Sequence, residues 1–437
     1  MASARSKNFE NISSSFWALP AVLVGASFAL SLASVEIDRR FFAKSAHALW
    51  LFGGSPDAAR EVLSVIAGSL ITVVAVAFSV TIVALQQAST QYSPRVLNRF
   101  TQDRGNQLVL GVYIGTFTFS LIVLWSIRSE DGTGGQFVPA LSVMIAGLMA
   151  LASLGLLVYF IHHIIDLIRI PTILAGIRGQ LDQQIRKICK NPQGKGDPKE
   201  ERYIEAVQQT SSRRVGRETV VVSEFEGHIR MIDEDRLYSL FKDEKKAFVW
   251  IPRAVGEYLI PGSVLVRIWA AKEQNDHWTK QLRKIVVIDA KRSIYQDPIY
   301  GFRQLVDVAL KALSPGLNDP TTAEQCLLYL KGALGLIVAR ELPRMSYQRD
   351  GVHYLLKKPS FNDFVGISFN QIVHAGKHDS HVMMSVLSTI DELIPLCPSS
   401  ERMHALLSPV DTIITNAESP RVQEAARQIR ANAVLRK

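Results

Sequence analysis

Residues 62–94, VLSVIAGSLITVVAVAFSVTIVALQQASTQYSP, contain no Asp, Glu, Lys or Arg, and this stretch decides the fold class. Three further stretches also lack these residues, namely 11–35, 105–127 and 132–165. A helix needs about 20 apolar residues to cross the roughly 30 Å hydrocarbon core of a bilayer. All four stretches are long enough to do so. The sequence therefore predicts transmembrane helices near residues 16–35, 63–85, 108–127 and 138–161.

The distribution of charge divides the 437-residue chain into two parts. Residues 1–168 carry 10 basic and 9 acidic side chains, whereas residues 169–437 carry 39 and 31, a net charge of +8. The second part has the composition of an ordinary soluble domain, and the first does not. This pattern excludes a simple soluble enzyme, a disordered chain and a fibrous repeat. The three cysteines are far apart in the sequence, which excludes a disulfide framework and a four-cysteine zinc site.

The first stretch follows Arg5 and Lys7, as the apolar part of a signal peptide would. Its apolar run is too long for a typical signal peptide and three more spans follow, so we expect a retained helix. Basic residues precede span one, lie between spans two and three, and follow span four, which predicts that these regions are cytoplasmic. The loop after span one also contains basic residues, against this rule. We expect both termini in the cytoplasm.

Span two is predicted to be longer than a membrane requires. Ser55 is a suitable N-cap, Pro56 fits the first helical position, and Asp57 places an acid in the first turn. A helix from about residue 56 to 92 would be roughly 55 Å long at 1.5 Å per residue. We therefore expect its end, residues 86–91, to project into the cytoplasm.

Residues 169–218 are predicted to form basic linker helices. Residues 169–217 contain 11 basic and 5 acidic side chains, which favours a solvated linker after the last span. Attraction to anionic lipid headgroups is the alternative. No basic face with interleaved aromatic residues is present, so we expect no binding of nucleic acid.

The remaining chain is predicted to form two further parts. Short β-branched runs at 219–222, 247–251, 264–268 and 285–288 predict a small β-rich module over 219–296. From residue 297 to 437 apolar residues recur at helical spacing, which predicts a C-terminal helical domain. Its helices are expected near 299–313, 320–341, 361–374, 379–396, 399–415 and 419–434. The predicted fold class is therefore a membrane α-helical domain of residues 1–168 followed by a cytoplasmic α+β region.

Four motifs carry a family resemblance: FSVTIVAL at 78–85, QYSPRVL at 91–97, GVYIGTF at 111–117 and ALSPGLNDPTTA at 312–323. They resemble the bacterial predicted membrane proteins of domain-of-unknown-function family 2254. The resemblance extends from about residue 15 to past 390, and Gly316 stands where the family pattern has Ala. It implies a bacterial inner-membrane location, four N-terminal spans and a cytoplasmic domain. It implies no activity, so function has to be argued from the residues.

Span two carries a polar face. Thr72, Ser79 and Gln86 recur every seven residues, and Ser69 lies one turn from Thr72. A repeated polar face in hydrocarbon is expected to meet protein or water, which favours a hydrated pathway lined by these side chains. The alternative is that the hydroxyls bond to their own or a neighbouring helix. Four helices enclose little space, so a pore would require several copies, and we expect a homo-oligomer.

Two other spans contain candidate residues. Gly111 and Gly115 form a GxxxG pattern on span three, which predicts close helix packing within or between subunits. His162, His163 and Asp166 lie at the end of span four. Titratable groups at membrane depth are candidates for function, and His changes charge near neutral pH, so this cluster is a candidate pH sensor. Interfacial anchoring is the alternative.

The soluble part contains two weaker signals. In the loop 314–322, Asp319 is a predicted N-cap, and Ser314, Asn318, Asp319 and Thr321 are candidates for a ligand or subunit contact. His374, His378 and His381 have a spacing that can bind zinc, but Gly376 and Lys377 interrupt it and no catalytic Glu accompanies it. We therefore expect no metal or cofactor. No nucleophile elbow, phosphate loop or CxxC motif is present, and we expect no enzyme.

The sequence features described above are compatible with two functions, and they favour the first. The first is an oligomeric inner-membrane protein that forms an ion or small-solute pathway gated by its cytoplasmic domain. The alternative is a non-conducting membrane sensor or scaffold whose cytoplasmic domain binds a ligand or protein partner. The two differ in whether any solute crosses the membrane.

Overall fold

The structure, a computed structural model, describes residues 17–42, 55–91, 103–128, 137–189, 203–214, 216–242, 244, 246–270 and 276–435. The chain forms two compact units, Met1–Thr172 and Ile173–Lys437.

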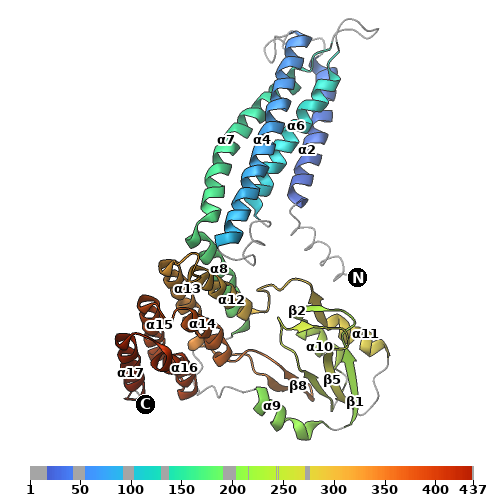
Figure 1. The fold of residues 1–437 in the computed structure, drawn as a ribbon. Helices are drawn as coiled ribbons and strands as arrows, with labels where there is room; N and C mark the ends of the chain where they lie inside the picture. The colour runs from blue at the N-terminus through green and yellow to red at the C-terminus, as the bar shows by residue number, and fades with distance from the viewer. Residues whose placement is uncertain are drawn as a thin grey trace. The chain divides into compact units, whose positions relative to one another are not determined.

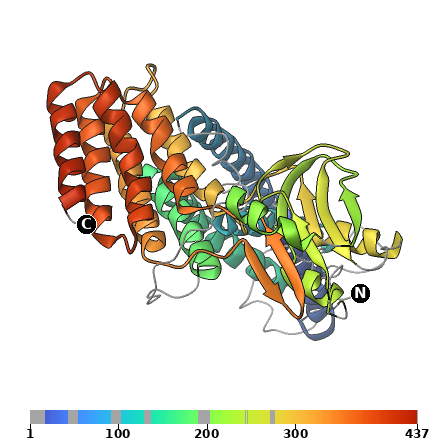
Figure 2. The same cartoon turned by 90° about the horizontal axis from the view of Figure 1, so that it is seen from below.

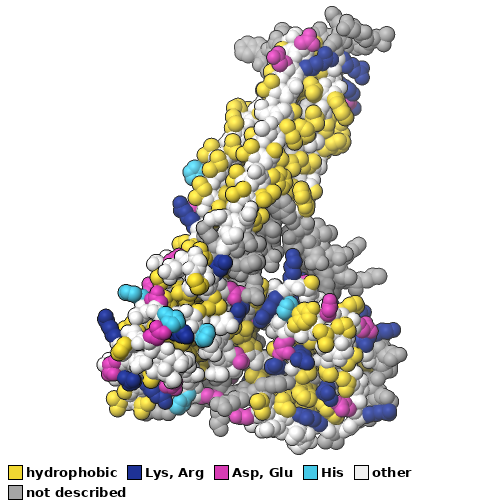
Figure 3. Space-filling model, in the orientation of Figure 1, with side chains coloured by type: hydrophobic (Ala, Val, Ile, Leu, Met, Phe, Trp, Pro, Cys, Tyr) yellow, Lys and Arg dark blue, Asp and Glu magenta, His cyan; other side chains and the backbone are white. Residues whose placement is uncertain are grey.

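Unit one is a bundle of four helices (Figure 1). They are α2 (Ala18–Ile37), α4 (Pro56–Gln91), α6 (Arg104–Ser126) and α7 (Ala140–Ile168). Each is long and apolar enough to cross a membrane. Figure 3 shows hydrophobic side chains along the length of this bundle and charged side chains near its ends. The predicted fold class, four candidate membrane-spanning helices followed by a region of small sheets and C-terminal helices, is confirmed.

Helix α4 begins as its sequence predicts. The backbone N–H of Ala58 donates to Ser55 Oγ at 3.2 Å, and that of Ala59 donates to the Ser55 carbonyl at 3.0 Å. The helix continues to Gln91 over 36 residues, which corresponds to roughly 54 Å. Whether its end reaches the cytoplasm stays a prediction.

Helix α6 lies at the centre of the bundle, because it packs against α2, α4 and α7. One face of α4 is buried in the bundle and consists of small and branched apolar residues at helical spacing. These are Ala59, Leu63, Ala67, Leu70, Val74, Ala77, Ala84 and Ala88. Alanines on this face let the two helix backbones approach closely.

A buried carboxylate links α2 to α7. Asp38, the first residue of the π-helical turn η1 (Asp38–Phe42) that follows α2, is only 1% exposed. Its carboxylate accepts hydrogen bonds from the backbone N–H groups of Leu141 and Ser142, at 3.0 and 2.9 Å. These N–H groups lie in the first turn of α7 and have no partner within their own helix. Asp38 therefore caps α7 from another helix.

Unit two contains two sheets that share a hydrophobic core. The five-stranded sheet has the order β1 (Arg217–Val222), β5 (Val264–Ala270), β3 (Phe248–Ile251), β8 (Val352–Leu356), β7 (Ser346–Arg349). The three-stranded sheet has the order β4 (Tyr258–Leu259), β2 (Gly227–Ile232), β6 (Val286–Asp289). All pairs are antiparallel except β3 and β8. The short helices α10 (Glu234–Leu240) and α11 (Asp276–Ile285) accompany these strands.

The β-rich module is not confined to residues 219–296, and residues 297–437 are not wholly helical. The hairpin β7–β8 comes from residues 346–356 and adds two strands to the larger sheet. β8 pairs in parallel with β3, about a hundred residues earlier in the chain. This strand cannot be recognised from local sequence, because a run of five residues, 352–356, is too short for its periodicity to identify it. Nor does local sequence identify the strand with which it pairs. The strands β2 and β4 and the helix α11 were also not predicted.

The rest of unit two is a stack of helices, which Figure 2 shows side by side. They are α12 (Pro298–Ala312), α13 (Pro320–Val338), α14 (Phe361–Ala375), α15 (Ser380–Leu393), the short η4 (Ile394–Leu396), α16 (Ser400–Asn416) and α17 (Pro420–Leu435). Five of these helices begin at a side chain that accepts a backbone N–H. The capping residues are Asp297, Asp319, Ser360, Asp379 and Ser399. These caps explain why the predicted helix starts agree with the structure to within a few residues.

The two described helices of the predicted basic linker pack within unit two, whereas residues 190–202 and 215 of that linker lie outside the described residues. From Ile173 onward, α8 (Ile170–Ile188) buries one face, and Arg178 Nη1 donates to the Tyr329 carbonyl of α13 at 3.2 Å. In α9 (Tyr203–Gln209), which precedes the 3-10 turn η3 (Ser211–Arg213), Ala206 is buried against Phe248 and Trp269 of the larger sheet. The two linker helices therefore belong to the helical stack and to the β-rich module respectively.

Candidate functional site

The polar face of α4 lies on the outside of the bundle. Ser69, Thr72, Ser79 and Gln86 are all exposed, whereas the alanine-rich face of α4 packs against the other helices. Thr72 Oγ1 donates to the Gly68 carbonyl at 3.0 Å, within its own helix. A single copy of the bundle therefore does not enclose these side chains. They are available to lipid or to another copy.

Gly111 and Gly115 lie where α6 crosses α2. A Cβ atom at Gly111 would lie 2.5 Å from Leu23 Cδ1 and 3.0 Å from Pro20 Cα. A Cβ atom at Gly115 would lie 2.5 Å from Ser27 Oγ. The GxxxG pattern thus permits a close contact within one chain, the first of the two alternatives that the sequence left open.

The three candidate pH-sensing residues do not form one cluster. His163 Nε2 lies 2.6 Å from Oδ1 of Asp103, the N-cap of α6, and its ring stacks on Tyr159. His162 Nδ1 lies 3.0 Å from the Val158 carbonyl of its own helix. Asp166 instead pairs with Arg169 at 3.0 Å. His163 thus pairs with Asp103 rather than with His162 or Asp166, and a pH-sensing role of these residues stays a prediction.

The loop between α12 and α13 satisfies its own polar groups. The Asp319 carboxylate accepts from the Thr322 backbone N–H at 3.1 Å, and Ser314 Oγ donates to the Lys311 carbonyl at 2.6 Å. Asn318 adopts a left-handed conformation with φ of 45°, which Asn tolerates in turns. Ser314, Asn318 and Asp319 thus have structural roles, and a ligand or subunit contact here, including Thr321, stays a prediction.

The three histidines with the zinc-like spacing are separated by a helix boundary. His374 lies near the end of α14, and His381 lies in the first turn of α15. His378 lies between these helices, and its Nδ1 is 2.6 Å from a carboxylate oxygen of Glu418. His374 and His378 therefore do not share a helix face as the spacing suggested. Among the described residues, no group of three or more His, Cys, Asp or Glu side chains could hold a metal ion.

A cleft of about 1230 Å³ lies between the β-rich and helical parts of unit two. Its β-rich wall includes Ile232, Glu234, Tyr238, Gly256, Glu257 and Arg292. Its helical wall includes Asp297, Glu341, Asn362, Gly366, Asn370 and Gln371, and Lys357 and Lys358 follow β8. Ligand sites often lie in such clefts between two substructures. This site is not evident in the sequence, because its walls come from segments that are far apart in the chain.

Glu234 is the centre of one polar group in the cleft. Lys358 Nζ lies 3.0 Å from Glu234, and the Tyr238 hydroxyl donates to the same carboxylate at 2.7 Å. Tyr347 completes the group, with its hydroxyl 2.5 Å from that of Tyr238. Burial raises the pKa of Glu234, but Lys358 and the two tyrosines outweigh burial and hold that pKa below its ordinary value. Glu234 is therefore a carboxylate at neutral pH.

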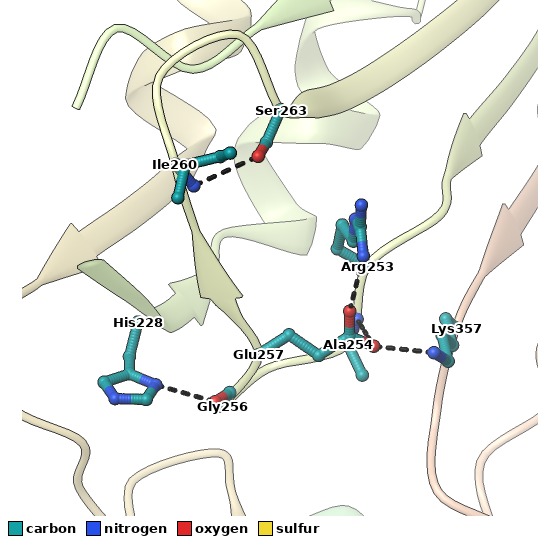
Figure 4. A network of polar contacts seen from close by, with 8 residues as sticks. All are labelled: His228, Arg253, Ala254, Gly256, Glu257, Ile260, Ser263 and Lys357. Atoms are coloured by element: carbon teal, nitrogen blue, oxygen red, sulfur yellow. Dashed lines mark hydrogen bonds and ion pairs between the residues drawn. The ribbon is translucent and has the colours of Figure 1, made fainter. Parts of the chain in front are cut away.

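Glu257 is the centre of a second polar group, which Figure 4 shows from close by. Lys357 Nζ lies 2.7 Å from Glu257, Arg253 lies 3.4 Å away, and the backbone N–H of Ala254 donates at 3.1 Å. Burial opposes ionisation, but these donors hold the pKa of Glu257 below its ordinary value. The three donors fix the carboxylate in one orientation beside the cleft.

A third charge pair joins the two walls. Arg292 Nε donates to Asp297 Oδ2 at 2.6 Å, and Asp297 caps α12 through the Tyr300 N–H. Burial raises the pKa of Asp297 above its ordinary value despite this arginine. Gly256, with φ of 91°, lies against both side chains, so any Cβ there would displace them. The cleft is thus lined by charges that are already paired and oriented.

The family comparison agrees with this architecture. The model of the family described as "Predicted membrane protein (DUF2254)" matches residues 13–392. The chain belongs to this family. Similar relatives are an uncharacterized protein of Mycobacterium bovis and uncharacterized proteins of two strains of Mycobacterium tuberculosis. Each is 28% identical over 455 residues, which cover the whole of this chain and 82% of the relative. No solved structure matches the chain significantly.

Proposed function

We propose that this membrane protein assembles as a homo-oligomer in the bacterial inner membrane and forms an ion or small-solute pathway. In this proposal the polar face of α4 lines the pathway, the second unit is cytoplasmic and gates it, and no enzymatic activity is assigned. The observation that carries the proposal is that Ser69, Thr72, Ser79 and Gln86 lie on the outer surface of the bundle.

The polar side chains of α4 form a stripe along the helix. From Ser69 to Gln86 the stripe spans 17 steps of the helix, or roughly 26 Å, which is most of a bilayer core. Polar side chains that face hydrocarbon prefer to turn towards protein or water. Association of several copies around an axis would place one such stripe from each copy against water in the centre. The alanine-rich face would remain in contact with α6.

Flux measurements test the lining role. Purified protein in liposomes should conduct, and Ser79→Trp should reduce the flux at least tenfold, because four or more indoles would fill the axis. Leu151→Trp is the matched control, since Leu151 is 65% exposed on α7, away from the stripe. Flux that Ser79→Trp leaves unchanged would contradict the lining role. Light scattering in detergent should give a mass of at least four copies, and a monomer or dimer would exclude an axial pore.

The cleft favours a second candidate function, a non-conducting sensor whose cytoplasmic unit binds a ligand or protein partner. The supporting observation is the set of fixed charge pairs around a cleft of about 1230 Å³. This function predicts that a partner binds in a stoichiometric complex and that no flux occurs at any voltage. Asn370→Trp, which fills part of the cleft, should abolish partner binding, whereas Gln428→Trp on α17 should not. Flux that depends on Ser79 would exclude it.

A further inference from the structure

Helix α6 carries a second polar row, and this row faces the interior of the bundle. Asn106, Tyr113 and Ser120 follow each other at intervals of seven residues and are 1%, 0% and 0% exposed. Among the described residues, the Asn106 amide, the Tyr113 hydroxyl and the Ser120 hydroxyl have no hydrogen-bond partner. Seven residues are close to two helical turns, so the three side chains lie on one face over about 21 Å.

This face is opposite to the one that packs on α2. Gly111, on the α2 side, is two positions from Tyr113, which is more than half a turn around the helix. Tyr113 packs among Val74 and Ala77 of α4 and Phe160 of α7. The polar row therefore lies between α4, α6 and α7, inside a single copy of the bundle.

Other buried hydroxyls in the same helices are satisfied. Thr116 Oγ1 donates to the Val112 carbonyl at 2.8 Å, and Ser153 Oγ donates to the Met149 carbonyl at 2.8 Å. Ser and Thr can bond to their own helix in this way, but the amide of Asn106 and the phenol of Tyr113 extend beyond it. A buried polar group without a partner is costly, and lipid supplies no donor or acceptor. A small polar molecule bound along the row would supply the missing hydrogen-bond partners.

We propose that ordered water molecules bind along this row and form a hydrated file inside each copy of the bundle. Water fits because an amide and two hydroxyls offer both donors and acceptors, and internal water commonly binds otherwise unsatisfied buried polar groups. The site carries no charge of its own between Asn106 and Ser120, which disfavours a bound ion.

The two ends of the file differ. At one end the backbone N–H of Asn106, not its side-chain amide, donates to Asp103 Oδ1 at 2.9 Å, next to His163. The side chains of Asp103 and His163 are 19% and 23% exposed, so water can reach this end. Beyond Ser120 the bundle is closed by an apolar cluster that includes Leu63, Phe119 and Val123. The file is thus open at the Asp103 end and ends at an apolar layer.

Radiolytic labelling of the full-length protein in detergent tests this site. Short X-ray exposure produces hydroxyl radicals from bound water, and these modify adjacent side chains. Each labelling rate is divided by the rate of the same residue in the denatured chain. We expect Tyr113 to be labelled at least fivefold faster than Phe119 and Phe160, which are 0% and 2% exposed in the same bundle. Equal rates for the three residues would overturn the proposal.

Variants distinguish the water file inside each bundle from the proposed pathway along the outer face of α4. Ser120→Ala and Asn106→Leu each remove water partners and should lower Tyr113 labelling at least twofold. Thr116→Val removes a buried hydroxyl that bonds to its own helix and should leave labelling unchanged. Ser79→Trp acts on the outer face of α4 and should also leave it unchanged. Unchanged labelling in folded Ser120→Ala protein would contradict the file, whatever the flux measurements give.

Discussion

Asp38 and Ser142 lie 104 residues apart in sequence, yet the Asp38 carboxylate accepts two hydrogen bonds from Ser142. The backbone N–H of Ser142 donates at 2.9 Å and its hydroxyl donates at 2.7 Å. The Ser142 hydroxyl also lies 2.9 Å from Ser34 Oγ of α2. This arrangement fastens the end of α2 to the beginning of α7, where an acid also interacts favourably with the helix dipole.

Asp38→Ala should therefore destabilise the bundle. The change leaves the backbone N–H groups of Leu141 and Ser142 without their acceptor, at a cost of about 2–5 kcal/mol, while the Ser142 hydroxyl retains Ser34 Oγ. The thermal unfolding midpoint in detergent should fall by several degrees. Asp57→Ala is the control, because the Asp57 side chain is 88% exposed and should matter by less than about 0.5 kcal/mol. Equal effects of the two changes would show that Asp38 is no cap in solution.

Gly111→Ala should destabilise the contact between α2 and α6. The new Cβ would lie 2.5 Å from Leu23 Cδ1, so the helices have to separate or Leu23 has to move, at a cost of about 1–3 kcal/mol. Gly155→Ala on α7 is matched, because a Cβ there meets nothing within 4 Å. It should leave stability unchanged or raise it by up to about 1 kcal/mol through helix propensity. Thermal unfolding midpoints compare the two variants, and a stabilised Gly111→Ala protein would refute the close contact.

Arg402→Met should destabilise unit two, because Arg402 is buried and satisfies the end of α13. Its Nη1 donates to the carbonyls of Val338 and Arg340, both at 2.8 Å, and its guanidinium lies over the Phe361 ring. Methionine can fill the space but cannot donate, so we expect a loss of about 3 kcal/mol in chemical denaturation. Arg427→Met, on an exposed side chain, should lose less than about 0.5 kcal/mol. Partial recovery in Arg402→Lys would identify the lost donors as the cause.

The Glu257–Lys357 pair predicts a pH dependence of stability. The pKa of Glu257 is lower in the folded chain than its ordinary value of 4.5. The ionised pair therefore stabilises the fold above about pH 4.5, and this contribution is lost as the pH falls through the lower folded value. Because Lys357 is 38% exposed, the contribution should not exceed about 1 kcal/mol.

Unfolding of wild-type and Glu257→Gln protein between pH 7 and pH 3.5 measures this contribution. The difference in stability should be largest at pH 7 and should shrink below pH 4.5. In the Lys357→Met background the same change should have a smaller effect at pH 7. A difference that grows as the pH falls would reverse the sign and contradict the assigned direction of the pKa.

Local sequence predicted much of the architecture where the relevant physics is local. The apolar runs identified all four spans, and Ser55-Pro56 and Asp319-Pro320 marked the starts of α4 and α13. The candidate site was predicted less well. The polar face of α4 was recognised by its spacing, but its position on the outer surface depends on which face packs against α6. His163 was singled out, while its partner Asp103, sixty residues earlier, was not.

Local sequence alone indicates four helices long and apolar enough to cross a membrane, followed by an α+β unit. Those features follow from the length of apolar runs, residue periodicity and capping side chains, and each of these signals lies within one continuous segment of the chain. Only the tertiary structure decided the parallel pairing of β8 with β3, the cleft between the two walls of unit two, and the buried row of Asn106, Tyr113 and Ser120. These depend on contacts between residues far apart in the chain, whose energies come from burial and hydrogen bonding that no local pattern encodes.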